Sequence, residues 1–187
     1  MKAIALRLAI VGSCVLMFVA TAARADEQID NPQYKQWSNF KTGSWVKYKT
    51  TSEAAGQQTT MEMTTKLLEI TPDKAVVERT TSMVAAGQKM DMPAQKQEIP
   101  AKIDKPVVKL SDVKPDVKEG QDDVSVTGKT FKCKTAETTM KNADNTTWSK
   151  TWMCDEVPTG LVKMESKNDG QFKSSTAMEL VGFEVVK

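Results

Sequence analysis

The chain of 187 residues contains no histidine, and this absence excludes several kinds of chemistry at once. Without imidazole there is no Ser-His-Asp or Cys-His nucleophile system, no histidine-zinc site and no histidine acid or base. The sequence also holds neither a glycine-rich phosphate loop nor a calcium-loop signature. Its acidic residues are scattered at expected strand-surface and turn positions. We therefore predict a protein that is not an enzyme and that carries no cofactor.

Beyond the first 25 residues, Arg79 is the sole arginine, and the other basic residues are lysines. Bidentate arginine contacts are the commonest means of recognising phosphates and base edges. The sequence thus argues against a nucleic-acid partner. No later apolar stretch approaches the roughly 20 residues that a membrane helix needs, so no transmembrane segment is expected after residue 25.

The first 25 residues form the one long hydrophobic segment and predict a signal peptide. Lys2 and Arg7 precede an apolar run over residues 8–19, and Ala23-Arg24-Ala25 matches a small-x-small cleavage site. An alternative treats residues 11–14 as a loose lipoprotein box, at which Cys14 would be lipidated. The apolar run that precedes this box is too short for such a signal. We expect cleavage near Ala25 and a periplasmic or extracellular protein.

Cleavage removes three bases and no acid, leaving 23 bases against 24 acids and a net charge near −1. The remaining residues, 26–187, have the length of a single domain. Asn31-Pro32 resembles a helix cap followed by a first-turn proline and predicts a short helix within residues 30–40.

After that helix, alternating Thr, Val, Met and Lys with recurring turn residues predict a sequential antiparallel sheet. Prolines at 100, 106 and 115 indicate a loop over residues 100–120. The expected strands lie near 43–53, 58–70, 75–85, 89–99, 123–127, 130–141, 146–154, 161–168 and 171–186.

Two cysteines remain in the predicted exported chain, Cys133 and Cys154. A turn centred on residues 142–145 pairs residues whose numbers sum to 287, which sets Cys133 opposite Cys154 and Glu137 opposite Lys150. Counting back from the turn gives the cysteines a non-hydrogen-bonded position, within disulfide range. We predict a structural disulfide. The alternative, a redox pair, lacks the usual Cys-x-x-Cys spacing.

The next hairpin, around Asn168-Asp169-Gly170, admits two loop lengths that orient its strands differently. We favour a three-residue loop with Gly170 in the left-handed position. This choice gathers apolar side chains on one face of the hairpin, namely Val162, Met164, Phe172, Thr176 and Met178.

Methionine is the one functional hint in the composition, since nine remain after residue 25. Met61 and Met63 share one side of a strand, as do Met90 and Met92, and a turn at Ala86-Gly87 would set Met83 opposite Met90. Such a patch fills a core or lines a site for acyl chains. A weaker alternative is a Cu(I) site built from the thioethers of the two pairs.

The order of signal peptide, short helix and bent antiparallel meander resembles the half-barrel of LolA-type and LppX-type lipid or lipoprotein carriers. The segments from Trp37 to Val46 and from Trp152 to Pro158 are also similar to stretches of uncharacterised bacterial exported proteins. The first resemblance implies an open sheet whose concave face holds apolar ligands.

The expected protein is thus mainly β, a strongly curved half-barrel or barrel-like antiparallel sheet with a short N-terminal helix. Its expected function is non-catalytic binding of an apolar or lipid-like ligand on the concave face. An envelope structural or protein-interaction module is the second hypothesis, and Cu(I) binding by methionine is the third.

Overall fold

The computed structural model describes residues 28–85, 87–105, 115–142, 145–170 and 173–186. The predicted signal peptide, with its cleavage site and Cys14, lies outside the described residues. Within them the chain forms a nine-stranded antiparallel sheet in the order β5-β4-β3-β2-β11-β10-β9-β8-β7, and a separate two-stranded sheet of β1 and β6. The predicted fold class, mainly β with a short N-terminal helix, is confirmed.

The elements follow one another as a meander with one short helix near its start. Their bounds are β1 Gln28–Asp30, α1 Pro32–Ser38, β2 Trp45–Ala54, β3 Gln57–Ile70, β4 Lys74–Ala85, β5 Gln88–Pro100, β6 Lys102–Asp104, β7 Asp116–Val126, β8 Lys129–Asn142, β9 Asn145–Met153, β10 Leu161–Asn168 and β11 Ser174–Glu184.

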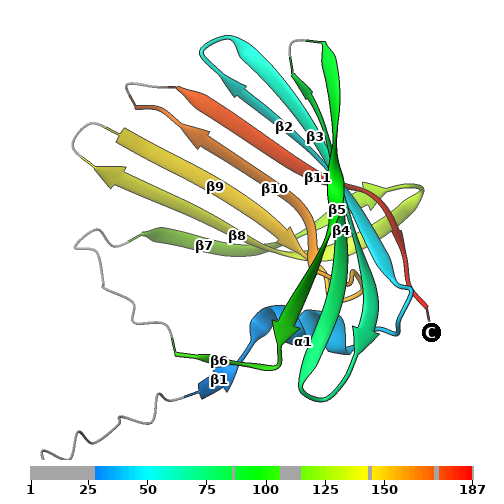
Figure 1. Ribbon diagram of the computed structural model, residues 1–187. Coiled ribbons are helices and arrows are strands. Elements are labelled where there is room, and N and C mark those ends of the chain that lie inside the picture. Colours follow the sequence, from blue (N-terminus) through cyan, green and yellow to red (C-terminus); the bar gives the residue numbers. More distant parts are fainter. Residues whose placement is uncertain (1–27, 86, 106–114, 143–144, 171–172, 187) are drawn as a thin grey trace, which may run out of the picture.

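The large sheet is open, with β5 and β7 as its two edges. It curves strongly and arches over α1, which lies beneath the strands at one end of the arch (Figure 1). The last strand, β11, inserts between β10 and the early strand β2, so residues 174–184 pair with residues 45–54. The protein is therefore a half-barrel whose concave side holds the helix.

Helix α1 forms where the sequence predicted it, because Asn31 caps its first turn. The Asn31 side chain accepts a hydrogen bond from the Gln33 backbone N–H at 3.0 Å, and Pro32 occupies the first turn. The same side chain donates to the Pro100 carbonyl at 2.8 Å. The cap thus fixes the helix start and also ties it to the end of β5.

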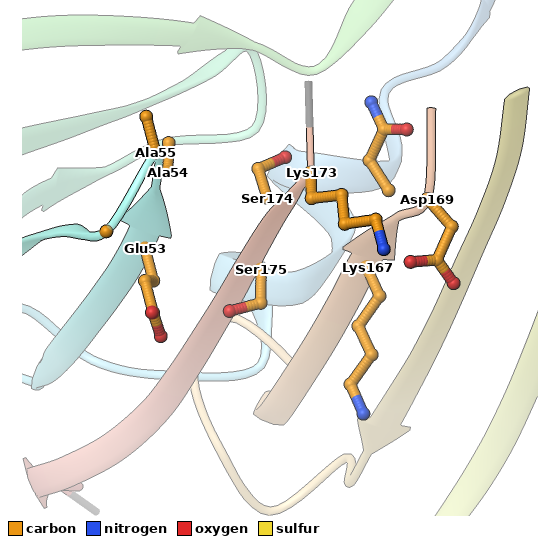
Figure 2. Close-up of a pocket in the computed structure, with 10 residues that line it drawn as sticks. Glu53, Ala54, Ala55, Lys167, Asp169, Lys173, Ser174 and Ser175 are labelled. Atoms are coloured by element: carbon orange, nitrogen blue, oxygen red, sulfur yellow. The ribbon is translucent and has the colours of Figure 1, made fainter. Parts of the chain in front are cut away.

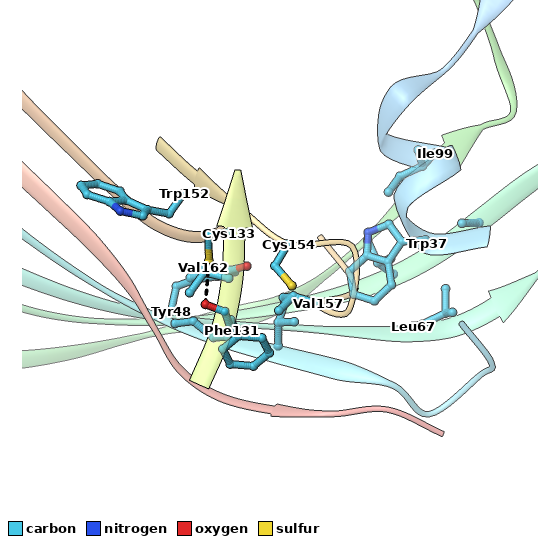
Figure 3. Close-up of a cluster of buried hydrophobic side chains, with 14 residues drawn as sticks. Trp37, Tyr48, Leu67, Ile99, Phe131, Cys133, Trp152, Cys154, Val157 and Val162 are labelled. Carbon is cyan, nitrogen blue, oxygen red and sulfur yellow. Dashed lines mark hydrogen bonds between the residues drawn. The ribbon is translucent and has the colours of Figure 1, made fainter. Parts of the chain in front are cut away.

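The hydrophobic core fills the helix end of the arch. Trp37 of α1 lies beside Leu67 and Ile99, and Phe131, Val157 and Val162 close the other side (Figure 3). Phe131 packs edge-on against Phe183 at a ring-centroid distance of 5.5 Å. The core is built from side chains of α1, from most of the strands and from the segment after β9.

The hairpin of β8 and β9 has the predicted register. Thr135 lies opposite Trp152, Glu137 opposite Lys150 and Thr139 opposite Trp148. The ladder ends at the pair of Lys134 and Met153, because the Cys154 N–H turns away to donate to the Gly160 carbonyl. Cys133 and Cys154 are therefore neighbours just past the ladder, and both are buried with free thiols.

Two expectations about connections need correction. Of the predicted loop over residues 100–120, residues 102–104 form β6 and residues 116–120 begin β7, while 106–114 lie outside the described residues. Strand β7 is an edge strand paired only with β8, and residues 116–123 are exposed. It therefore lacks the apolar alternation by which strands are recognised in a sequence.

The hairpin of β10 and β11 has a longer loop than expected. Asn168 pairs with Ser174, so five residues connect the strands instead of three. The predicted sidedness nevertheless holds for the described residues, because Met164 lies opposite Met178 and Val162 and Thr176 alternate with them. Phe172 lies outside the described residues.

Candidate functional site

The two faces of the sheet differ in chemistry, and register assigns each strand residue to one of them. Directly opposed residues of neighbouring strands share a face, and so do residues two apart along a strand. Val46, Tyr48 and Leu67 mark the face that packs on α1, which we call the helix-side face. Because the sheet arches over α1, the helix-side face is the concave one (Figure 1).

A line of methionines crosses this face beyond the core. Successive cross-strand pairs join residues of seven strands, from β9 through β10, β11, β2, β3 and β4 to β5. We call this line the methionine row. It runs Thr151, Met164, Met178, Thr50, Met61, Met83 and Met90.

A second line of small hydroxyl side chains runs beside the methionine row, farther from the core. It consists of Ser149, Ser166, Thr176, Ser52 and Thr59, which are also successive cross-strand partners. Ser52 and Thr176 share a hydrogen bond between their hydroxyls at 3.2 Å. The open end of the concave face is therefore polar but carries no charge along this line.

Charge is almost excluded from the helix-side face of the central strands. Among the residues of β10, β11, β2, β3 and β4 that alternate onto this face, Arg79 is the only charged one, and it is exposed. Such a distribution differs from that of an ordinary solvent-facing sheet surface, where charged residues alternate outward. The face is suited to contact with apolar matter.

The opposite face carries the lysines and glutamates of the same strands. Lys47 pairs with Glu62 at 2.7 Å, and Lys163 pairs with Glu165 at 2.8 Å and with Glu179 at 3.5 Å. The Lys47 ammonium holds the pKa of Glu62 below its usual value. These partly exposed pairs keep this face solvated and contribute little to stability.

Trp152 lies among the lysines of that opposite face. Lys150 and Lys163 lie over the Trp152 ring at 4.6 and 5.2 Å from its centroid, and Trp152 Nε1 donates to Asp122 at 3.1 Å. This hydrogen bond is the main reason that the pKa of Asp122 lies below its usual value. Trp152 is 6% exposed and belongs to the hydrophobic core, while its ring and Nε1 contact the charged side chains around it.

The part of the chain that the structure describes leaves the methionine row partly accessible. Met61, Met83, Met164 and Met178 are half-buried, whereas Met90 is 47% exposed. Met92 lies two residues after Met90, on the same face, and is 46% exposed. Apolar side chains thus remain accessible over much of the concave face, within reach of an apolar ligand.

A hollow lies at the rim of the arch, between the tips of the β2–β3 and β10–β11 hairpins. Its volume is about 840 Å³, and its lining includes Glu53, Lys167, Lys173 and Ser175 (Figure 2). The lining is polar, with charges of both signs and hydroxyls, and the pairing of Ser175 with Lys167 and Glu53 places these three residues on the face opposite the methionine row. Sequence reasoning missed it because it is formed by two hairpins that are distant along the chain.

The structure brings together the methionines singled out in the sequence. Met61 lies opposite Met83, and Met83 lies opposite Met90, as a turn at Ala86-Gly87 predicted. Met63 and Met92 follow on the same face, separated by Thr81. Among the described residues, no group of three or more His, Cys, Asp and Glu side chains could hold a metal ion.

The buried ionisable groups lie in the core, away from the methionine row's exposed end. Burial raises the pKa of Tyr48 to about 12, and its hydroxyl bonds with Thr159 and donates to the Leu161 carbonyl at 2.6 Å. Burial, with the neighbouring Cys154 and Asp122, raises the pKa of Cys133 to about 11. Both groups stay neutral at physiological pH and serve packing.

In the described part of the chain, no helix has the length and apolar character needed to cross a membrane.

No protein-family model matches the chain, and no curated protein matches it. Among solved structures it is similar to a putative lipoprotein from Parabacteroides distasonis, with 12% identity and a TM-score of 0.44 over 77% of this chain and 96% of the other. It is also similar to a putative exported protein with a YmcC-like fold from Bacteroides fragilis, with 10% identity and a TM-score of 0.43 over 78% and 97%.

A LolA superfamily protein from Nitrosomonas europaea is a more distant likeness, with 7% identity and a TM-score of 0.25 over 85% of this chain and 94% of the other. The solved structures similar to this chain thus include an exported protein and a LolA superfamily member, the classes that the sequence resembles. At these TM-scores we transfer no function from them.

Proposed function

We propose that this protein is a non-catalytic exported binding protein that holds an apolar, lipid-like ligand against the concave, helix-side face of its sheet. The observation that carries the proposal is the methionine row, a line of accessible thioether and hydroxyl side chains on an almost uncharged face. Methionine suits such a surface because its flexible, polarisable side chain adapts to apolar partners of varied shape.

The arrangement of the core supports the same function. Helix α1 and the segment after β9 fill one end of the arch, where Trp37, Leu67 and Val157 are buried. The described residues leave the row beyond them only half-buried, so its side chains remain partly accessible. A ligand with an apolar chain would extend the core along the methionine row, and its polar end would reach the hydroxyl line.

Export supports a lipid-like ligand as well, since such molecules need a protein cover when they move through water. The predicted signal peptide directs the chain out of the cytoplasm. The remaining hypothesis, an envelope interaction module without a small ligand, would show itself as a stable oligomer or a bound protein instead.

The test is a pair of lysine substitutions on one strand, Met61→Lys and Thr60→Lys. The two residues are neighbours on β3, are both half-buried and lie on opposite faces of the sheet. Binding of a dansyl-labelled fatty acid is measured by fluorescence. We expect Met61→Lys to weaken binding at least about tenfold, because a charge is then placed against an apolar chain.

Thr60→Lys adds the same charge to the already charged face and should change the affinity less than about twofold. Thermal unfolding followed by circular dichroism establishes that both variants are folded. Equal loss of binding in the two folded variants, or no loss in Met61→Lys, would show that the helix-side face does not bind the probe.

A further inference from the structure

Three methionines meet at the β5 edge of the sheet, on three adjacent strands. Met61 of β3, Met83 of β4 and Met90 of β5 are consecutive members of the methionine row. Directly opposed side chains in an antiparallel sheet have Cβ atoms about 4.5–5.5 Å apart. Met83 therefore has a directly opposed thioether neighbour on either side.

This spacing lets the three sulfur atoms converge on one point above Met83. Each methionine has three rotatable bonds and no branch, so its sulfur can be moved several ångströms without disturbing the backbone. Met63 and Met92 lie two residues after Met61 and Met90 on the same face, and Thr81 lies between them. They can add a further thioether from the diagonal position.

The surroundings favour a soft cation over a hard one. Within the described residues of β3, β4 and β5, this part of the helix-side face presents no carboxylate, and the protein has no histidine. Hard cations require oxygen ligands, whereas thioethers select Cu(I). Met90 is 47% exposed on an edge strand, so an ion can enter from solvent.

We propose that Met61, Met83 and Met90 form a three-thioether site for Cu(I) at the β5 edge of the helix-side face. The site differs from the set predicted from the sequence, because Met83 is its central ligand and Met63 and Met92 flank it. It is independent of the proposed apolar ligand, since substitution of methionine by leucine keeps the face apolar while removing the sulfur.

The same row provides a matched control. Met164 and Met178 are also directly opposed, but Thr50 separates them from Met61, so they form an isolated pair of thioethers. Substitution of methionine by leucine conserves volume and is usually tolerated in a packed site. Variants in the two parts of the row therefore differ in sulfur position and little else.

The experiment uses the exported chain with its methionine methyl groups labelled with ¹³C. Silver(I), an air-stable substitute for Cu(I), is titrated while the methyl resonances are followed, and Cu(I) affinity is then measured anaerobically against bicinchoninate. We expect the methyl groups of Met61, Met83 and Met90 to shift first. Met83→Leu should weaken Cu(I) binding at least about tenfold, whereas Met164→Leu/Met178→Leu should change it less than about twofold.

The methyl resonances separate this site from the two cysteine thiols, which could bind the same ions when reduced. Shifts confined to methionines outside β3, β4 and β5, or none at all, would overturn the proposal. So would a Met61→Leu/Met83→Leu/Met90→Leu variant that binds Cu(I) as the unmodified chain does. An unmodified chain that binds the fatty acid but not Cu(I) would overturn the metal site and leave the proposed function standing.

Discussion

At the scale of single residues, Tyr48 shows how a polar group is accommodated in the core. The residue is 3% exposed, and its hydroxyl forms hydrogen bonds with Thr159 and with the Leu161 carbonyl. These bonds link β2 to the segment that precedes β10, two strands away in the sheet. Burial opposes ionisation of the phenol and raises its pKa to about 12.

Tyr48 should make the protein less stable at alkaline pH. Below pH 10 the phenol is protonated in both the folded and the unfolded chain, so its ionisation has no effect on stability. Between pH 10 and 12 the unfolded chain loses this proton and the folded chain keeps it, which lowers the free energy of unfolding by up to about 1.4 kcal/mol per pH unit.

Tyr48→Phe removes this titration together with the hydroxyl's hydrogen bonds. Urea unfolding at several pH values should show a constant stability advantage of the unmodified chain below pH 10, and a shrinking one above it. An advantage that stays constant up to pH 12 would mean that the phenol ionises equally well in the folded protein.

The second prediction at this scale concerns Cys133 and Cys154. Both thiols are buried neighbours at the end of the β8–β9 ladder. We predict that they form a disulfide, because the compartment predicted for this chain is oxidising and thiols so placed need little movement to meet. A bridge closing this loop of roughly 20 residues should stabilise the fold by about 3 kcal/mol.

The measurement is the mass of the denatured exported chain after iodoacetamide treatment, with and without a reductant. The bridged protein takes up no label until it is reduced and is lighter than the reduced chain by two hydrogens. Labelling of both cysteines in the denatured chain without a reductant would show that the thiols are free.

At the scale of elements, the sequence predicted most strands because each carries its own signal. The Asn31 cap fixes α1, and the turn around residues 142–145 fixes the register of β8 and β9 to the residue. Strand β7 was predicted too short, since its charged first half faces solvent at the sheet edge. The alternation on which strand prediction depends requires one buried face.

Loop length is the other property of elements that the sequence left uncertain. Asn168-Asp169-Gly170 favoured a short connection, but the strands leave the ladder at Asn168 and Ser174. In the structure the Asn168 side chain accepts a hydrogen bond from the Gly170 N–H at 3.0 Å, an Asx-type turn that begins a longer loop. A loop of residues 168–170 would pair residue 167 with residue 171, so the observed pairing is shifted in register by four residues. Because this shift is an even number, Met164 and Met178 remain on the predicted face.

At the scale of the whole molecule, the site depends on pairings that the local pattern could not supply. Met164 and Met178 join Met61 and Met83 in one row only because β11 returns to pair with β2 across more than a hundred residues. The sequence indicated a methionine patch on β3, β4 and β5. The hydroxyl line and the near-absence of charge on the concave face appear only when all strands are aligned.

The separation of charge between the two faces is also a whole-molecule property. Lysines and glutamates of β2, β3, β10 and β11 lie on the convex face, where pairs such as Lys47–Glu62 and Lys163–Glu165 are in contact. The concave face of the same strands keeps an accessible apolar surface, which in a protein without a ligand or partner would be a liability. This asymmetry is the strongest physical reason to expect an occupant.

Native mass spectrometry of the exported protein, without added metal, tests the presence of this occupant most directly. The chain is purified from a bacterial host, measured under non-denaturing conditions and measured again after denaturation. We predict an additional mass in the range of a lipid that is lost on denaturation and that is absent from Met61→Lys but present in Thr60→Lys. Protein at the mass of the bare chain in every sample, with no lipid taken up from added vesicles, would contradict a lipid-binding concave face.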